Sequence, residues 1–298
     1  MSHPDILCIG SVLWDIIGRT DKPLRERGDV PGRITRLPGG VAMNIAMTLA
    51  RFGLRPAVLT AIGEDDAGRE LTAAVQSLGV DASYALRRAD LVTDTYMAIE
   101  DASGLIAAIA DAASLEAADD AVLAPLGDGR LGSAGAPWAG LIALDGNLTA
   151  SLLGRIAASP LFARADLRVA PASPGKAERL LPLIAHPRVT LYVNRQEAGL
   201  LTGTQPASSR EGAEALVTAG ASRVLVTDGA RDASDAMRGA ETLTLPSRAV
   251  AVRRITGAGD TFMAAHLFAE GRGATRAEAL LRAQAAAAAY VAFEDVIP

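Results

Sequence analysis

The stretch ITGAGDTFMAAH, residues 255–266, combines a glycine turn, a carboxylate and the start of a helix. It follows a strand-prone segment at residues 242–252, and its second half is apolar with helical spacing. Gly257 and Gly259 let the backbone pass close to a ligand, and amides at a helix N-terminus favour an anion such as phosphate. Asp260 is placed to accept a proton from an attacking hydroxyl. The alternative is a plain helix N-cap, because aspartate is a favoured capping residue.

The composition describes an acidic chain with a large aliphatic core. Of the 298 residues, 50% are hydrophobic and only 4% aromatic, and the net charge is -5, which argues against nucleic acid as a partner. Cys8, the single cysteine, lies in an apolar run, so neither a disulfide framework nor a cysteine-rich metal site is expected. Neither a signal-peptide pattern nor an apolar window of roughly 18 residues is found. We therefore expect a cytoplasmic protein with no membrane partner.

Short apolar runs alternate with helical segments along most of the chain. Strands are expected at residues 5–12, 56–62, 140–145, 167–170, 189–193 and 223–227. This alternation predicts a doubly wound, mostly parallel α/β sheet with helices on both faces. With no internal repeat and no clear linker, residues 1–298 are expected to form a single domain.

Two stretches break this alternation. Residues 18–37 are polar and rich in turn formers, and residues 91–111 read as two strands joined by a turn at residues 100–104. We expect them to form a small inserted β-sheet. Such a sheet suits a lid over a site, and its edge strands suit pairing in a homodimer.

Polar residues follow several predicted strands at their carboxyl ends, where open α/β sheets bind ligands. Asp15 follows the first strand, and Asn147 follows the strand at residues 140–145. Gly39-Gly40 permits close approach to the helix that follows, and Asn44 in its first turns suits a sugar hydroxyl. The alternatives are a turn aspartate at Asp15 and a solvent-facing asparagine at Asn44.

Asn194 and Glu197 open a helix after the strand at residues 189–193, three positions apart, so their side chains point the same way. A capping box uses the same spacing, with asparagine as the cap and glutamate three residues later. The G-x-G-x-x-G spacing at residues 127–132 lacks a preceding strand and a following helix, so a flexible loop is predicted there. No Walker-type phosphate loop occurs.

Three motifs together, PGGVAMN (38–44), NRQE (194–197) and ITGAGDTFMAA (255–265), resemble the ribokinase-like pfkB family of carbohydrate and nucleoside kinases. Their order and spacing match over nearly the whole chain. The resemblance implies ATP-dependent phosphorylation of a sugar hydroxymethyl group with Mg²⁺. It implies that Asp260 is the catalytic base, and that Asn194 and Glu197 organise Mg²⁺ through water.

The resemblance also implies how the two substrates are bound. The amides that would surround the transferring phosphoryl group are those of Gly257, Ala258, Gly259 and Asp260. The residues that would bind the sugar are Asp15, Gly39, Gly40, Asn44, Asp111, Asn147 and Lys176. The residues that would border the nucleotide are Thr227, Gly229, Thr256, Gln284 and Ala288.

Within the family, the sugar-binding half is most similar to pseudouridine kinases. The similar stretches are residues 31–53, AIAD at 108–111, DGN at 145–147, and PAS at 171–173 followed by Lys176. Ribokinase, fructokinase and other nucleoside kinases are the alternatives of the same class. A non-catalytic sugar sensor and, from residues 127–132 alone, a dinucleotide-dependent oxidoreductase are the alternatives of other classes.

The chain departs from the family pattern at two positions. Many members carry an acid two residues before the first Thr-Gly of the last motif, where it helps to bind a monovalent cation. Here that residue is Arg254, whose fixed charge would repel K⁺, so weak or absent K⁺ activation is expected. Asp232 stands where members often keep a glycine after Gly229, which predicts an altered nucleotide loop.

Overall fold

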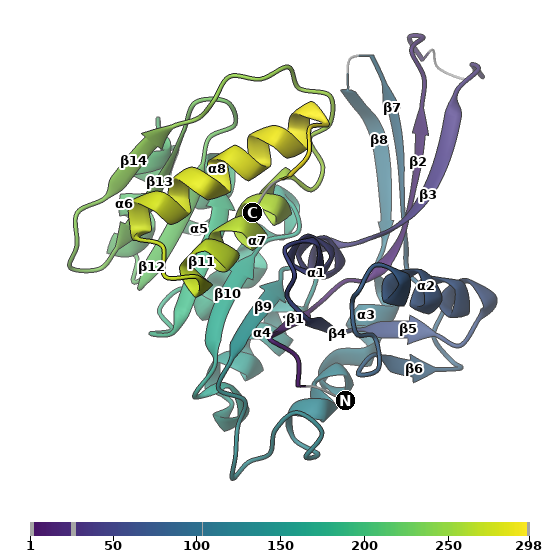
Figure 1. Cartoon of the computed structure of the whole chain (residues 1–298), viewed down its shortest axis with the longest axis horizontal. Coiled ribbons are helices and arrows are strands. Elements are labelled where there is room, and N and C mark those ends of the chain that lie inside the picture. The colour runs from purple at the N-terminus through teal and green to yellow at the C-terminus, as the bar shows by residue number, and fades with distance from the viewer. Residues whose placement is uncertain (1–2, 25–27, 103, 297–298) are drawn as a thin grey trace.

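The computed structural model describes residues 3–24, 28–102 and 104–296. Its central sheet has eight strands in the order β14-β13-β12-β11-β10-β9-β1-β4 (Figure 1). They are β1 (Ile6–Ile9), β4 (Pro56–Leu59), β9 (Leu141–Asp145), β10 (Asp166–Ala170), β11 (Val189–Asn194), β12 (Arg223–Thr227), β13 (Asp232–Met237) and β14 (Leu243–Pro246). The pairs from β4 to β12 are parallel, and only β13 and β14 are antiparallel to their neighbours. The predicted mostly parallel α/β sheet is confirmed.

Helices cover both faces of this sheet (Figure 1). They are α1 (Val41–Arg51), α2 (Asp66–Ser77), α3 (Ala113–Ala118), α4 (Ala150–Ala158), α5 (Arg195–Thr202), α6 (Ser209–Thr218), α7 (Ala258–Gly271) and α8 (Arg276–Ala292), with 3-10 turns η1 (Asp119–Leu126), η2 (Pro160–Phe162) and η3 (Pro174–Leu183). Leu7 and Ile9 of β1 join a core with α4, α5 and α6, whereas Ile6 and Cys8 join a core with α1, α7 and α8. The alternation of side chains along a strand therefore produces two cores, one on each face.

A second sheet, here called the small sheet, stands beside the body of the molecule (Figure 1). Its order is β3-β2-β7-β8, from β2 (Leu13–Arg19), β3 (Arg33–Gly39), β7 (Thr95–Asp101) and β8 (Gly104–Asp111). The predicted inserted sheet is present, although β2 starts before residue 18 because only a short turn separates it from β1. Asp15 therefore lies within β2 rather than in a turn. Residues 25–27 and 103 of the predicted ranges lie outside the described residues.

Several local predictions need correction. The strand expected at residues 56–62 is divided into β4 and a separate β5 (Ala61–Gly63), which pairs with β6 (Leu86–Arg88). The strand expected at residues 242–252 ends at Pro246. β13 was not predicted, because its sequence DASDAM is low in strand-forming residues. It pairs with β12 and β14, and its buried Asp235 accepts hydrogen bonds from Arg223 and Arg276, a tertiary arrangement that local sequence does not reveal.

Residues 127–132 form turns and bends between η1 and β9, so the predicted loop is confirmed and the dinucleotide fingerprint is excluded. Asp232 is the first residue of β13, and its carbonyl accepts a hydrogen bond from the amide of Asp228, which closes a short hairpin turn around Gly229. Within the described ranges, no helix is long and apolar enough to cross a membrane.

Candidate active site

Asp260 lies in the first turn of α7, half-buried, and Asn44 of α1 donates a hydrogen bond of 2.8 Å to its Oδ2. Burial raises the pKa of Asp260 to about 7; the bond from Asn44 opposes the shift, and the carboxylates of Asp145, Asp15 and Glu197 add to it. Two motifs that are far apart in the sequence thus meet in one contact. A carboxyl with a pKa near neutrality is suited to general-base chemistry.

The turn before α7 depends on two glycines. Gly257 has φ 89°, and a Cβ there would lie 2.4 Å from the hydroxyl of Tyr290, so only glycine fits. A Cβ at Gly259 would meet no atom within 4 Å, so that side of the turn is open. Of the four amides predicted to bind phosphate, that of Ala258 already donates to the carbonyl of Ile255 at 3.1 Å. The turn can therefore receive an anion with the remaining amides.

Asp15 projects from β2 onto the diglycine that precedes α1. A Cβ on Gly39 would lie 2.1 Å from Asp15 Oδ2, and one on Gly40 would lie 2.5 Å from the carbonyl oxygen of Ser11. Glycine at both positions is thus required for the close packing of Asp15 and Ser11 against this turn, and the role of Gly39 and Gly40 in binding a sugar stays a prediction. Burial raises the pKa of Asp15 to about 6.

Asn147 belongs to a buried network behind the diglycine. Its Nδ2 donates to Ser11 Oγ at 2.9 Å and to Asp145 Oδ1 at 3.0 Å, and its Oδ1 accepts from Lys176 Nζ at 2.6 Å. Ser11 Oγ in turn accepts from the amide of Val41 at 3.0 Å, at the start of α1. Asn147 and Lys176 are therefore hydrogen-bonded within the protein close to the start of α1, and their role as sugar ligands stays a prediction.

Asp111 lies on the opposite face of the small sheet from Asp15. Asp15 is in register with Tyr96, and Tyr96 with Ala110, so these three residues share a face and Asp111 points the other way. The structure does not bring Asp111 together with Asp15. Instead it brings in Tyr96, which sequence reasoning missed; burial raises its pKa, and the charge of Asp15 adds to this shift.

Asn194 and Glu197 form a complete capping box at the start of α5. Asn194 Oδ1 accepts from the amide of Glu197 at 2.9 Å, and Glu197 Oε2 accepts from the amide of Asn194 at 2.8 Å. Burial raises the pKa of Glu197 to about 7, although hydrogen bonds to its carboxyl from the backbone and side chain of Asn194 oppose the shift. The capping interpretation is therefore confirmed, and it leaves open a second role for the same pair at the end of β11.

The residues predicted to border the nucleotide come from three elements. Thr227 ends β12 directly beside Asn194 of β11, and Gly229 follows with φ 60° and open space around its Cα. Gln284 of α8 is buried and donates to the carbonyl of Leu245 at 2.8 Å, and Ala288 is buried one turn later. Thr256 accepts a hydrogen bond on its carbonyl from Tyr290.

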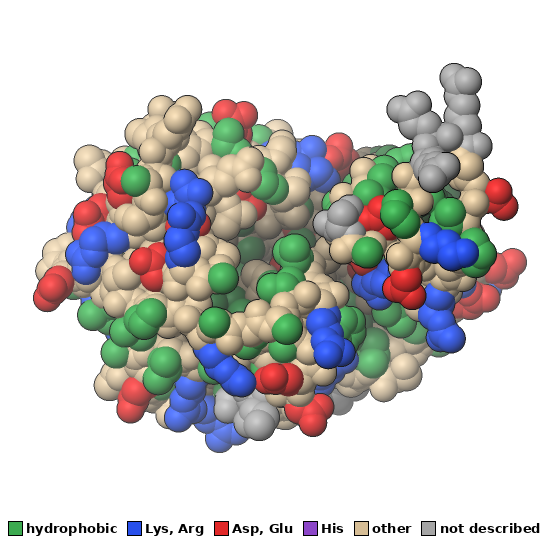
Figure 2. Space-filling model, turned by 90° about the horizontal axis from the view of Figure 1, so that it is seen from above, with side chains coloured by type: hydrophobic (Ala, Val, Ile, Leu, Met, Phe, Trp, Pro, Cys, Tyr) green, Lys and Arg blue, Asp and Glu red, His purple; other side chains and the backbone are tan. Residues whose placement is uncertain are grey.

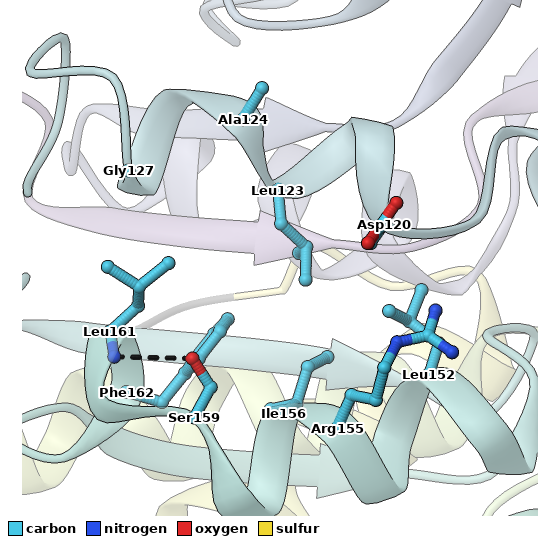
Figure 3. Close-up of a pocket in the computed structure, with 10 residues that line it drawn as sticks. All are labelled: Asp120, Leu123, Ala124, Gly127, Leu152, Arg155, Ile156, Ser159, Leu161 and Phe162. Atoms are coloured by element: carbon cyan, nitrogen blue, oxygen red, sulfur yellow. Dashed lines mark hydrogen bonds between the residues drawn. The ribbon is translucent and has the colours of Figure 1, made fainter. Parts of the chain in front are cut away.

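The molecule is hollowed between its body and the small sheet (Figure 2). A different pocket of about 370 Å³ lies between η1 and α4, lined by apolar residues such as Leu123, Ile156 and Phe162 with Arg155 at its side (Figure 3). None of the predicted site residues lines that pocket. We therefore assign the candidate site to the contacts around Asp260.

Comparison with known proteins identifies a family that this chain matches. A family model described as pfkB family carbohydrate kinase matches residues 3–297. The pseudouridine kinase of Escherichia coli (strain K12) is 33% identical over 107 residues, which cover 36% of this chain and 34% of that protein. The bifunctional protein HldE of Caulobacter sp. (strain K31) is 28% identical over 327 residues, covering 98% of this chain and 60% of that protein. The chain thus spans less than two thirds of these relatives.

Solved structures show the same fold. A carbohydrate kinase from Agrobacterium tumefaciens has a TM-score of 0.77 at 28% identity, covering 95% of this chain and 89% of that one. Arabidopsis thaliana ribokinase complexed with ribose and ATP has a TM-score of 0.76 at 21% identity, covering 97% and 93%. The chain belongs to the pfkB family of carbohydrate kinases, and its fold is ribokinase-like.

Proposed function

We propose that this protein transfers the γ-phosphoryl group of ATP to the hydroxymethyl oxygen of a sugar or nucleoside, with pseudouridine as the first candidate. The observation that carries the proposal is the half-buried Asp260, bonded to Asn44 and placed after an open glycine turn at a helix N-terminus. A base, a partner for a sugar hydroxyl and donors for an anion are what phosphoryl transfer requires.

In the proposed reaction, Asp260 takes the proton of the acceptor hydroxyl as its oxygen bonds to the γ-phosphorus. The bond from that phosphorus to the bridging oxygen of ADP breaks, which yields ADP and a phosphate monoester. Asp15 and Asn44 orient the sugar, and free amides of the turn at Gly257–Asp260 stabilise the charge on the phosphoryl oxygens. Because its pKa lies near 7, Asp260 is able to hold the proton at neutral pH.

ATP and Mg²⁺ fit the residues that are present. The open space at Gly229 and Gly259 leaves the backbone accessible to phosphates. Mg²⁺ keeps most of its waters, and when bound it offsets the charge of the phosphates. Asn194 and Glu197, beside Thr227 at the ends of β11 and β12, would hold those waters.

Two observations favour a nucleoside as the acceptor. The relatives include a pseudouridine kinase, and the stretches noted above as similar to pseudouridine kinases include residues 31–53 and 108–111. Tyr96 shares a face with Asp15 on the neighbouring strand, so an aromatic ring is available to a base attached to a sugar bound at Asp15. A ribokinase- or fructokinase-type sugar kinase is the alternative, and the similarity to the carbohydrate kinase from Agrobacterium tumefaciens supports it. A non-catalytic sugar sensor is less favoured because Asp260 and both glycines are intact.

ADP release is the experiment that tests this function. The purified protein with ATP and Mg²⁺ is offered pseudouridine, uridine, adenosine, ribose and fructose in parallel. We expect release with pseudouridine above the others. Release with ribose or fructose instead would identify a sugar kinase, and ligand binding without any release would favour the sensor.

We also propose that the small sheet forms a homodimer contact. On the face away from Asp15, register places Met97 beside Ile109, and Ile34 and Ile99 on either side of Gly18. Their exposed fractions are 46% for Met97, 71% for Ile109, 77% for Ile34 and 43% for Ile99. Isolated exposed apolar residues are ordinary, but a continuous apolar sheet face is typical of an interface, and a second copy offers an identical face.

A further inference from the structure

Arg254 lies against the C-terminal end of α8, four residues before α7 begins. Its Nε donates to the carbonyl of Tyr290 at 2.7 Å, and its guanidinium lies 3.5 Å from the centroid of the Tyr290 ring and 4.5 Å from that of Phe293. The last carbonyls of a helix lack partners within the helix and carry partial negative charge. A fixed positive charge is therefore bound where the helix end favours a cation.

Tyr290 connects this contact to the glycine loop, which we define as residues 255–259. Its hydroxyl donates to the carbonyl of Thr256 at 2.9 Å and lies 2.4 Å from the position that a Cβ of Gly257 would take. In a trans peptide the C=O and the following N–H point in opposite directions. The hydrogen bond to Thr256 thus sets the direction of the Gly257 amide, one of the donors proposed to face the phosphoryl group.

We infer that Arg254 and Tyr290 are positioning residues for the glycine loop, and that the Arg254 guanidinium takes the place of a monovalent cation at this helix end. The inference rests on the proposed kinase function and adds to it a reason for the geometry of the loop. Arg254 holds the ring of Tyr290 by stacking and by the bond to its carbonyl, and Tyr290 holds the peptide between Thr256 and Gly257.

The residues around Arg254 do not fit a monovalent cation. Such a cation needs several oxygen ligands, but the carbonyl of Tyr290 already accepts from Arg254, and that of Val291 accepts from the amides of Arg253 and Arg254 at 2.8 and 3.2 Å. The positive charge of the Arg254 guanidinium would also repel a monovalent cation bound next to it. The structure thus supports the expectation of weak K⁺ activation with a specific arrangement of groups.

Hydrogen–deuterium exchange of the amides of residues 255–260 tests the positioning role without any turnover. Arg254→Ala and Tyr290→Phe are compared with the wild type, and Arg272→Ala is the matched control. Arg272 also stands at a helix end over an aromatic ring, 5.2 Å from the centroid of Phe268, but it lies at the opposite end of α7 from the glycine loop. We expect the amides of residues 255–260 to exchange faster in Arg254→Ala and Tyr290→Phe than in the wild type, and at the wild-type rate in Arg272→Ala. Equal exchange in all four proteins would overturn the inference.

Kinetics test the replacement of the cation. We expect Arg254→Ala to lower kcat about tenfold, less than the loss of a whole anion-hole donor, with the KM of the acceptor unchanged. Millimolar guanidinium or K⁺ should restore part of that kcat, whereas the wild type should not respond to K⁺ at constant ionic strength. A severalfold rise in the wild-type rate with K⁺, or a variant that neither loses rate nor responds, overturns the replacement. Absence of turnover in the wild type would reject the proposed function, while the exchange result would still decide the positioning role.

Discussion

At the scale of single residues, the site depends on what burial does to carboxylates. Asp260, Glu197 and Asp15 all have raised pKa values, and in each the largest cause is burial. The charges of Asp15 and Glu197 also add to the shift at Asp260, and a carboxyl whose pKa is raised in this way is a candidate for chemistry. Of the three, Asp260 is the one beside the open glycine turn.

The first prediction concerns the protonation of Asp260. Because a general base must be deprotonated, kcat/KM should rise with pH through about 7 and level off above it. Asp260→Asn should lower kcat by about a thousandfold with little change in ATP affinity. Both are measured by ADP release from pH 5.5 to 9 and by nucleotide titration.

The Asn44→Ala variant tests whether the rise of kcat/KM with pH, here called the pH limb, reports the ionisation of Asp260. The bond from Asn44 lowers the pKa of Asp260, so its loss should move the limb to higher pH. A limb that stays in place in Asn44→Ala, or an Asp260→Asn variant with near-normal kcat, would show that another group is the base.

At the scale of elements, two helices begin with the same device. α5 starts with the capping box of Asn194 and Glu197, and α8 with that of Thr275 and Glu278. The first follows β11 beside the end of β12, whereas the second follows the loop after α7. The pair at α5 therefore has a position from which a second, metal-related role is possible, and the pair at α8 serves as its structural control.

The second prediction separates capping from metal binding. Asn194→Ala and Thr275→Ala should each lower the free energy of unfolding by about 1 kcal/mol, the usual contribution of such a cap, measured by urea denaturation. Only Asn194→Ala should raise the Mg²⁺ concentration for half-maximal activity severalfold. If both variants showed the same Mg²⁺ dependence, the role of Asn194 would be helix capping alone.

At the scale of the whole molecule, α7 connects the site to a charged cluster on the central sheet. His266 and Glu270 lie further along α7 from Asp260. Tyr192 Oη and His266 Nδ1 are 2.8 Å apart, and Arg168 and Arg223 each lie 2.6 Å from Glu270. The charges are paired, so the cluster holds α7 on the sheet without leaving a buried charge alone.

The third prediction is a loss of stability in acid. Burial lowers the pKa of His266 to about 4 from 6.5, so the folded state keeps the ring neutral while the unfolded state takes up a proton. Stability should be complete above pH 6.5 and fall toward pH 4, by up to about 3 kcal/mol from this group. Urea denaturation at several pH values measures it. His266→Asn should flatten this dependence, and His186→Asn, on a partly exposed histidine whose pKa is also lowered by burial and by Arg188, should flatten it less.

The fourth prediction concerns assembly through the small sheet. Ile109→Glu places a charge in the exposed apolar face and should convert a dimer into monomers in sedimentation experiments. Leu281→Glu, at a residue of α8 that is 58% exposed, is the control and should leave the dimer intact. A wild type that is monomeric at micromolar concentration would reject the contact.

The sequence by itself determined the layered fold, and it was enough to propose Asp260 as the base. Buried parallel strands read as continuous apolar runs, and the glycine turn before α7 has a local conformational requirement, so both are visible in short windows. The Asn194 and Glu197 spacing equally predicted the capping box that is present. These features depend on neighbours in the chain.

Only the tertiary structure decided which polar residues face one another. Asn147 donates to Ser11 and Asp145 and accepts from Lys176, and the register of β8 places Asp111 on the opposite face from Asp15. The roles of Tyr96 and Tyr290 could not be predicted from the sequence, because the residues that each of them contacts or faces are far away in the chain. A polar side chain's partners depend on register and helix packing, which shift by whole residues without altering the local pattern.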